Sequence, residues 1–248
     1  ADNTALGLSA GLAVTTGSRN IASGGVALDA ADAENDNLAI GYAALGGAIN
    51  GGEFNVAIGN YSLDANTSGD NNVGVGYDAA TANTTGANNI AIGHSALKSN
   101  TTAGGNIAIG YQALNDANRT VDANAFNVAI GHLAGNTGTN DITTGDQNVL
   151  IGYNTAASAI AANNQIVIGA SASGLGNDMA IIGNTDVDRL YAAQDGAAVL
   201  YANATINSSD SRVKRDINDL GYGLDFINSL RPVTYYKKDP MNYSQELK

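Results

Sequence analysis

A five-residue unit repeats along the chain, and this repeat constrains the fold more than any other feature. Each copy reads Asn, an aliphatic residue, a small residue, Ile or Val, and then Gly. Copies begin at Asn37, Asn55, Asn72, Asn89, Asn106, Asn127 and Asn148, with a variant at Gln165. Successive copies are 18, 17, 17, 17, 21, 21 and 17 residues apart. A period of this length is typical of a solenoid, in which every coil contributes the same element and stacks on the next.

Within each copy the residues alternate as they do in a β-strand. Val56 and Ile58 are expected to face one way and Ala57 the other, so the branched side chains form one stripe. The chain has no Trp, three Phe and 31 Gly, so bulky side chains cannot fill a globular core. We therefore predict an all-β, elongated parallel β-solenoid or β-roll of about nine coils, on the order of 45 Å long.

The Gly that ends each copy is predicted to lie at a corner, where a positive φ or a close backbone approach excludes a Cβ atom. A phosphate-binding loop is disfavoured, because no Lys and no βαβ pattern follows these glycines. The residues before each copy, such as 85–89, are rich in Gly, Asn and Asp and are predicted to form the other corners. The repeated asparagines are expected to form a ladder of side-chain amides along the stack.

A second short segment follows each Gly and is clearest in Tyr42-Ala43-Ala44-Leu45. His94 and His132 occupy the position that holds Tyr in other copies, so we predict that they belong to a ladder of rings. They lie 38 residues apart, and no Cys or acidic residue shares their spacing, so no metal site is predicted. Asp70 and Asp146 follow Gly in corners, where turn chemistry is a better explanation than calcium binding. No cofactor is predicted.

The face opposite the branched stripe carries a run of small residues: Ala39, Ala57, Gly74, Ala91, Ala108 and Ala129. Both faces of each strand are thus apolar or small, whereas a strand facing solvent would be polar on one side. Either a second layer of the same chain or a neighbouring subunit must cover the small face. Because the chain has so little aromatic bulk, we prefer a neighbouring subunit and predict a homotrimer.

Charge excludes several classes of partner. Residues 1–208 carry 17 acidic against 4 basic side chains, and residues 209–248 carry 6 against 7. Such an acidic shaft would repel nucleic acid and anionic membranes. No apolar run reaches the roughly 20 residues of a membrane span, so no insertion is expected. No carboxylate pair stands out as a glycosidase site, so no enzyme activity is predicted for the shaft. The chain starts inside repeat-like sequence at Asn3, and we expect it to be a fragment.

Over residues 37–183 the repeats, NIAIG followed by Tyr or His and then AL, resemble those of phage tail fibres. They are similar, more loosely, to the heads of bacterial trimeric autotransporter adhesins. The resemblance implies a trimeric shaft in the virion, outside the host cell, that binds a surface glycan or an outer-membrane component. The longer loops, 115–126 and 133–147, are candidates for that contact. The alternative is a bacterial trimeric surface adhesin head on the cell surface.

Residues 207–239 resemble the opening of the intramolecular chaperone auto-processing domain of phage tailspikes and fibres. The resemblance is carried by Ser209-Asp210, Lys214, Ile217, the expected short helix from Leu224 to Leu230, and Leu230-Arg231-Pro232-Val233. It implies that this domain trimerises the fibre, guides folding and is released by cleavage before Ser209. We expect a shaft over 1–183, a β-structured neck over 184–207, and the truncated start of the chaperone over 208–248, with a short α+β segment.

The resemblance also implies a single-turnover serine peptidase with a Ser–Lys dyad in the full-length parent. Ser209 would attack the carbonyl of Ser208, and a neutral Lys214 amine would take the hydroxyl proton. Because free lysine titrates near pH ~10.4, its pKa must be lowered by burial or by cationic neighbours, for which Arg212 and Arg215 are available. Ser208 and Ser211 are alternative nucleophiles. The plainer alternative is that Ser209 caps a turn and Lys214 is solvated.

Overall fold

The computed structural model describes residues 2–31, 33–48, 50–118, 124–188 and 190. Over these residues it contains no helix, and therefore none that could cross a membrane. It has eleven strands of three residues each: β1 (Thr4–Leu6), β2 (Ile21–Ser23), β3 (Leu38–Ile40), β4 (Val56–Ile58), β5 (Val73–Val75), β6 (Ile90–Ile92), β7 (Ile107–Ile109), β8 (Val128–Ile130), β9 (Val149–Ile151), β10 (Ile166–Ile168) and β11 (Ala180–Ile182).

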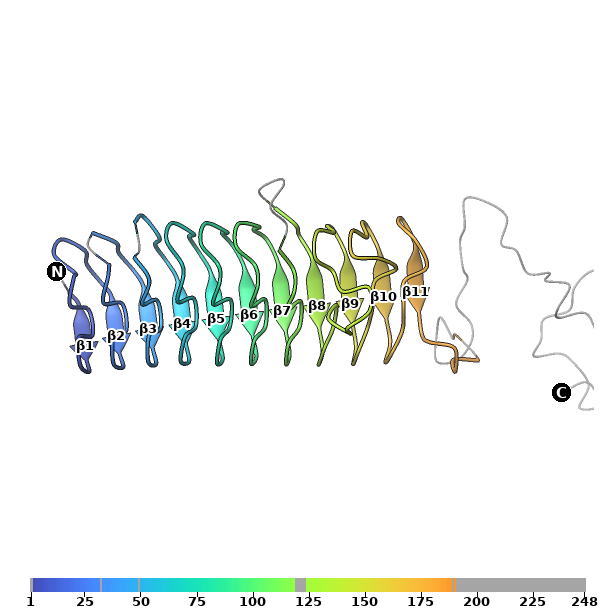
Figure 1. Cartoon of the computed structure of the whole chain (residues 1–248), viewed down its shortest axis with the longest axis horizontal. Helices are drawn as coiled ribbons and strands as arrows, with labels where there is room; N and C mark the ends of the chain where they lie inside the picture. Colours follow the sequence, from blue (N-terminus) through green and yellow to red (C-terminus); the bar gives the residue numbers. More distant parts are fainter. Residues whose placement is uncertain (1, 32, 49, 119–123, 189, 191–248) are drawn as a thin grey trace, which may run out of the picture. The chain divides into compact units, whose positions relative to one another are not determined.

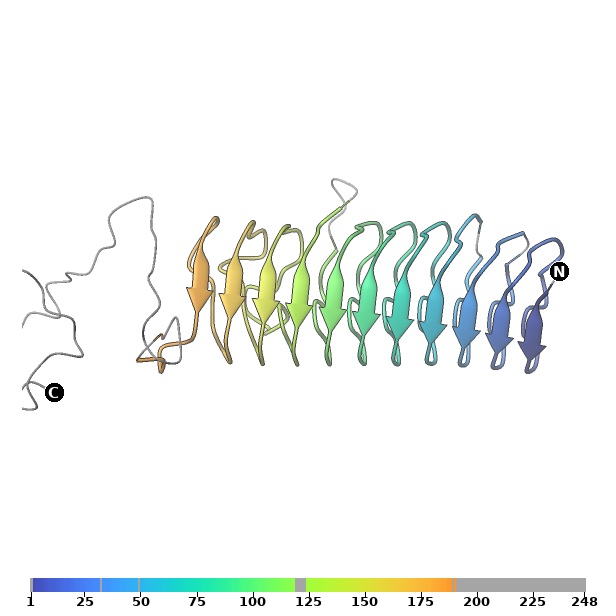
Figure 2. The same cartoon turned by 180° about the vertical axis from the view of Figure 1, so that it is seen from behind.

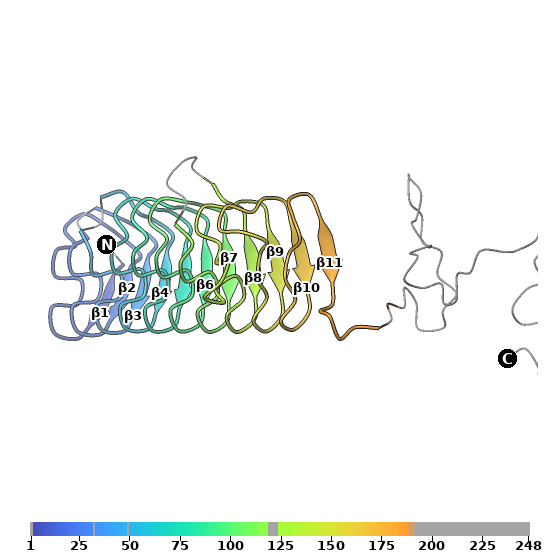
Figure 3. The same ribbon diagram turned by 45° about the vertical axis from the view of Figure 1, so that its right-hand side comes forward.

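All eleven strands form one parallel sheet in sequence order (Figure 1). This confirms the predicted all-β parallel solenoid, which is slightly longer than expected because β1, β2 and β11 extend it at the two ends. At roughly 4.8 Å per coil, the ten steps between strands span about 48 Å. The strands form one side of the stack (Figure 2), and each coil runs around a common interior (Figure 3). The short α+β segment and most of the neck expected over 184–207 lie outside the described residues.

Strand register is the same in every coil. Ala57 of β4 pairs with Ala39 of β3 and Gly74 of β5, so like positions lie above one another. The middle residue of β4 points inward and is fully buried, while Val56 and Ile58 are half-buried and point outward. The predicted alternation is therefore confirmed.

The small face is covered by the chain itself, and our preference for a neighbouring subunit there was wrong. Leucines from the second segment, the residues that follow each corner Gly, lie across the interior from the strand alanines. Leu45, Leu63, Leu97 and Leu114 are fully buried, as are the alanines of β3, β4 and β6. The coil is narrow, and small second-segment residues such as Ala44 and Ala96 are fully buried beside the leucines. Aromatic bulk is not needed, and the interior is complete within one chain.

The large and small residues exchange places near the C-terminal end of the stack. Gly135 occupies the position held by Leu114 in the preceding coil, and β9 has Leu150 where other strands have alanine. A Cβ atom on Gly135 would lie 2.8 Å from Leu114 Cδ2 and 3.0 Å from Leu150 Cδ1. In the coil of β9 Leu150 is followed by Ala156 in the leucine column, and in the coil of β10 Val167 is followed by Ser173. In these two coils the bulkier buried side chain therefore lies on the strand wall.

The corner glycines are required by close backbone packing, as predicted. Gly93, immediately after β6, has a φ of 133°. A Cβ atom there would lie 2.4 Å from the carbonyl oxygen of Gly110 in the next coil. Only glycine avoids both the unfavourable φ and this collision.

The second segment adopts left-handed conformations at residues other than glycine, which the sequence did not indicate. Ala43 and Leu45 have φ values of 53° and 48°. Two successive turns explain them, because the Ala44 N–H donates to the Gly41 carbonyl at 3.4 Å and the Gly46 N–H to the Ala43 carbonyl at 3.3 Å. A left-handed residue costs about 1–2 kcal/mol when it carries a Cβ atom. Hydrogen bonds from Ala43 and Leu45 to the coils on either side offset this cost.

The predicted asparagine ladder is present and runs without a break from Asn3 to Gln165. In each step the side-chain oxygen of one unit asparagine accepts the backbone N–H of the next, as from Asn89 to Asn72 at 2.9 Å and from Asn106 to Asn89 at 3.0 Å. The Asn89 side-chain amide also donates to the Ala103 carbonyl at 3.0 Å. These buried asparagines satisfy backbone groups that the corner leaves without a strand partner.

A second, shorter column of asparagines lies inside the stack. Asn83 Nδ2 donates to Asn66 Oδ1 at 3.0 Å, and Asn100 Nδ2 donates to Asn83 Oδ1 at 2.8 Å. The column ends where Ala117 follows, and Asn100 Oδ1 is the one buried side-chain oxygen or nitrogen within the described residues that has no hydrogen-bond partner. We had not predicted this column, although its 17-residue spacing was visible in the sequence.

Candidate functional site

The outward side of the sheet is the most distinctive surface of the described residues. None of the strand residues is charged, although residues 1–208 carry 17 acidic side chains. Five isoleucines of the paired strands are 37–45% exposed along this side: Ile21, Ile40, Ile92, Ile130 and Ile166. We call this surface, the outward residues of β2 to β10, the strand face. A continuous apolar stripe on an acidic rod is typical of a surface that binds another protein.

A ladder of rings borders the strand face at the C-terminal ends of the strands. Five successive rings stack with centroids 5.0–5.5 Å apart and interplanar angles of 18–30°: Tyr77, His94, Tyr111, His132 and Tyr153. The predicted place of both histidines in a ring ladder is confirmed. Tyr42, Tyr61 and Tyr77 continue it by edge contacts at 5.5 and 5.9 Å.

Two phenylalanines border the strand face at the other ends of the strands. Phe54 and Phe126 directly precede unit asparagines, have positive φ values of 59° and 52°, and are 53% and 54% exposed. The Phe126 ring covers Gly105, where an added Cβ atom would lie 2.6 Å from the ring. Exposed aromatic side chains therefore flank the apolar stripe on both edges. We had not predicted a role for these two phenylalanines, because each is an isolated aromatic residue in its corner.

The charged groups lie away from the strands, in the corners and second segments. Both basic residues that the structure describes are paired: Arg19 with Asp36 at 2.6 Å, and Lys98 with Asp78 at 2.8 Å. The hydrogen bond from Arg19 lowers the pKa of Asp36. Burial raises the pKa of Asp64, and two nearby aspartates add to the effect. The described surface thus offers no unpaired cation to an anionic ligand.

The described residues contain no group of three or more His, Cys, Asp or Glu side chains that could hold a metal ion. His94 and His132 do not meet, because Tyr111 lies between their rings. Asp70 Oδ1 accepts the Glu53 N–H at 2.8 Å, as expected for a residue that stabilises a corner. Of the two loops proposed for receptor contact, 133–147 is described, whereas 119–123 of the other loop is not.

Ser208, Ser209 and Lys214, the residues of the predicted cleavage site, lie outside the described residues. Comparison with known families bears on this part of the chain. Residues 209–246 match the family described as chaperone of endosialidase. The match starts at Ser209, the residue before which we had predicted cleavage. No curated protein and no solved structure matches the chain.

The family match covers only the C-terminal part of the chain, and the solenoid precedes it. This pairing agrees with the expected fibre shaft followed by the start of an intramolecular chaperone. The Ser–Lys dyad itself remains a prediction.

Proposed function

We propose that the chain is the homotrimeric shaft of a phage tail fibre or tailspike, part of the virion and directed to a receptor on the host surface. The C-terminal chaperone directs trimerisation and is released by autoproteolysis between Ser208 and Ser209. The observation that carries this proposal is the chaperone family match over residues 209–246, on the C-terminal side of a parallel β-solenoid. A bacterial adhesin head is less favoured, because that alternative predicts a membrane anchor in place of a chaperone.

The strand face supports a trimer, although by a different surface from the one we expected. The interior of each chain is already filled, so association must use an outward surface. The strand face is uncharged, apolar and bordered by exposed rings, whereas the acidic groups lie elsewhere. Acidic rods repel one another, and burying this face in a threefold contact would offset the repulsion. In this arrangement the second segments and the longer loops stay open to a receptor.

Native mass spectrometry of the 248-residue chain tests the assembly. We expect three times the chain mass of 25.0 kDa. Ile92 is 37% exposed, so Ile92→Glu should leave the single chain folded but place a charge in the contact. We expect this variant to shift the population to monomer. Thr85→Glu, an exposed corner residue outside the strand face, is the matched control and should remain trimeric. A monomeric wild-type chain would contradict the assembly.

A denaturing gel of a chain that carries the whole chaperone domain tests the cleavage. Ser209→Ala should abolish it because the nucleophile is lost, and Lys214→Ala should do so because the base is lost. Ser211→Ala removes a nearby hydroxyl and should be processed like wild type. Processing of the Ser209→Ala chain, or loss of processing only in Ser211→Ala, would refute the proposed dyad.

A further inference from the structure

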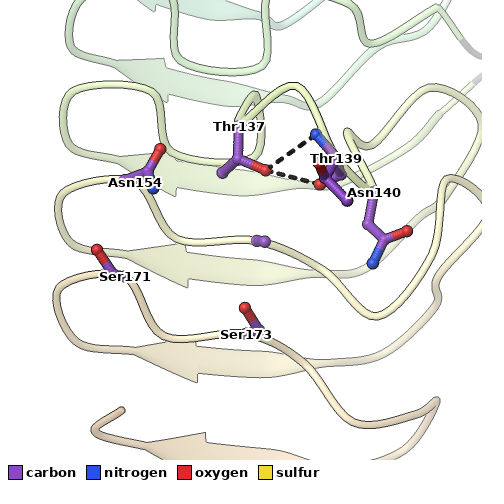
Figure 4. Close-up of a pocket in the computed structure, with 7 residues that line it drawn as sticks. Thr137, Thr139, Asn140, Asn154, Ser171 and Ser173 are labelled. Carbon is purple, nitrogen blue, oxygen red and sulfur yellow. Dashed lines mark hydrogen bonds between the residues drawn. The ribbon is translucent and has the colours of Figure 1, made fainter. Parts of the chain in front are cut away.

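A hollow of about 230 Å³ lies beside the loop that lengthens the coil of β8. Three successive coils contribute to its lining (Figure 4). Thr137, Thr139 and Asn140 come from the loop, Asn154 and Ala156 from the next coil, and Ser171 and Ser173 from the one after. No strand residue takes part, so a contact through the strand face would leave the hollow open.

Two of the residues that line the hollow, Ala156 and Ser173, belong to a column of small residues in the second segments. The backbone register places Leu114, Gly135, Ala156 and Ser173 in one column of the second segments. Leu114 is therefore followed by three small residues in this column.

The loop over the hollow is held in one conformation by its own hydrogen bonds. It arises from four extra residues, since the units at Asn127 and Asn148 are 21 residues apart instead of 17. Asp141 Oδ1 accepts the N–H groups of Thr137 and Gly138, the latter at 2.8 Å. The Thr137 hydroxyl donates to the Thr139 carbonyl at 2.6 Å. A rim fixed in this way loses little conformational entropy when a ligand binds.

Most polar groups around the hollow have no partner in the part of the chain that the structure describes. No side-chain hydrogen bond forms there at Thr139, Asn140, Asn154, Ser171 or Ser173. In the regular coils the pattern differs, since the hydroxyls of Thr67 and Thr84 each donate to a backbone carbonyl of the next coil at 2.9 Å. The hydroxyls and amides of the hollow are thus available to a ligand, and none of the lining residues is charged.

We propose that this hollow binds one uncharged sugar residue of a glycan. Hydroxyl and amide groups both donate and accept hydrogen bonds, as the hydroxyls of a sugar ring do. Within the part of the chain that the structure describes, an acidic sugar or a phosphate would find no lysine or arginine, because Arg19 and Lys98 are both paired elsewhere. The volume is below the roughly 300–1,000 Å³ of pockets for drug-sized ligands, which suits a single ring.

A second hollow of about 310 Å³ shares Ser171 and Ser173 with the first and gives room for an adjoining sugar residue. That the glycan belongs to a host cell surface rests on the proposed function, whereas binding in the hollow does not.

Saturation-transfer NMR of the 248-residue chain tests the site with glucose, galactose, mannose, N-acetylglucosamine and sialic acid. We expect transfer to at least one neutral sugar and none to sialic acid. Ser173→Phe fills the hollow from an exposed position and should abolish the transfer. Ser171→Ala combined with Ser173→Ala should weaken binding by about fivefold per lost hydroxyl. Thr85→Val, which removes an exposed hydroxyl outside the hollow, should have no effect.

Transfer to none of the neutral sugars, transfer to sialic acid alone, or undiminished binding by Ser173→Phe would each overturn the site. These outcomes are separate from the test of assembly. A chain that is monomeric but still binds a neutral sugar through Ser173 would support the site and contradict the trimer.

Discussion

Replacing Asn89 with alanine tests whether the asparagine ladder stabilises the stack. Asn89 is 1% exposed and lies in the middle of the solenoid. Its side-chain oxygen accepts the Asn106 N–H at 3.0 Å, and its amide donates to the Ala103 carbonyl at 3.0 Å. Asn89→Ala removes these two hydrogen bonds and a third, because the Asn106 side-chain amide also donates to Asn89 Oδ1 at 3.2 Å. It also leaves a small void between two coils.

The lost bonds differ in cost. The Asn106 N–H is left buried without an acceptor, which costs about 1–3 kcal/mol. The Ala103 carbonyl keeps a second donor, Asn100 Nδ2 at 2.9 Å. Loss of the hydrogen bond from Asn89 to this carbonyl therefore costs only the ordinary net value of about 1 kcal/mol. The Asn106 side-chain amide loses its acceptor as well, so we expect the free energy of unfolding to fall by at least about 3 kcal/mol.

Urea unfolding followed by circular dichroism measures this change, with an unchanged m-value as the sign that the folded state is intact. Asn136→Ala is the matched control. Asn136 is half-buried and makes no side-chain hydrogen bond among the described residues, so its loss should change stability by less than about 0.5 kcal/mol. A loss below about 1 kcal/mol for Asn89→Ala would show that the ladder is dispensable.

Three further predictions concern the interior, the backbone and pH. Leu150→Ala should lower the free energy of unfolding by about 3 kcal/mol in a urea titration, and adding Gly135→Leu should recover much of it by restoring the leucine and alanine arrangement of the other coils. Gln112 has a φ of 52°, so Gln112→Gly should be more stable than Gln112→Ala by about 1 kcal/mol in the same assay. Burial raises the folded-state pKa of Asp64 above its unfolded value, so the stability it contributes is present at low pH and is lost as pH rises through the folded pKa. Asp64→Asn should therefore raise the melting temperature near neutral pH, with the gain vanishing below the unfolded pKa; an equal gain at both pH values would contradict this reasoning.

Much of the coil could be predicted because its parts depend on local chemistry at a fixed spacing. A glycine such as Gly93 recurs where no other residue has room, and an asparagine such as Asn89 recurs where both a donor and an acceptor are needed. The ring ladder followed in the same way, since His94 holds the place of a tyrosine and can stack as one does. In each case the residue type that recurs at one position of the repeat was enough to predict what that position contacts in the next coil.

The identity of the inward face could not be read from the alternation alone. When both sides of a strand are apolar, the sequence does not indicate which side faces the interior. Our prediction that a neighbouring subunit covers Ala57 relied on the shortage of aromatic residues in the chain. The signal was Leu97 and its counterparts, one bulky residue in most second segments, each large enough to reach an alanine across a narrow coil. Ser173 and Ala156 of the hollow lie in the column that contains Gly135, and the four inserted residues hide that alignment in the sequence. For Ser209 and Lys214 the dyad stays a prediction.

The uniform register of the strands has a consequence for the length of this part of the molecule. If residues 73–89 were deleted, Asn72 would be followed by Ile90, and a complete unit would reform at the junction. Strand β4 would then lie beside β6 with the same pairing it now has with β5. The length of the solenoid can therefore change only in steps of about 4.8 Å, the spacing of one coil. Loss or duplication of the coding sequence for one coil would make such a step, and the coils on either side would keep their structure.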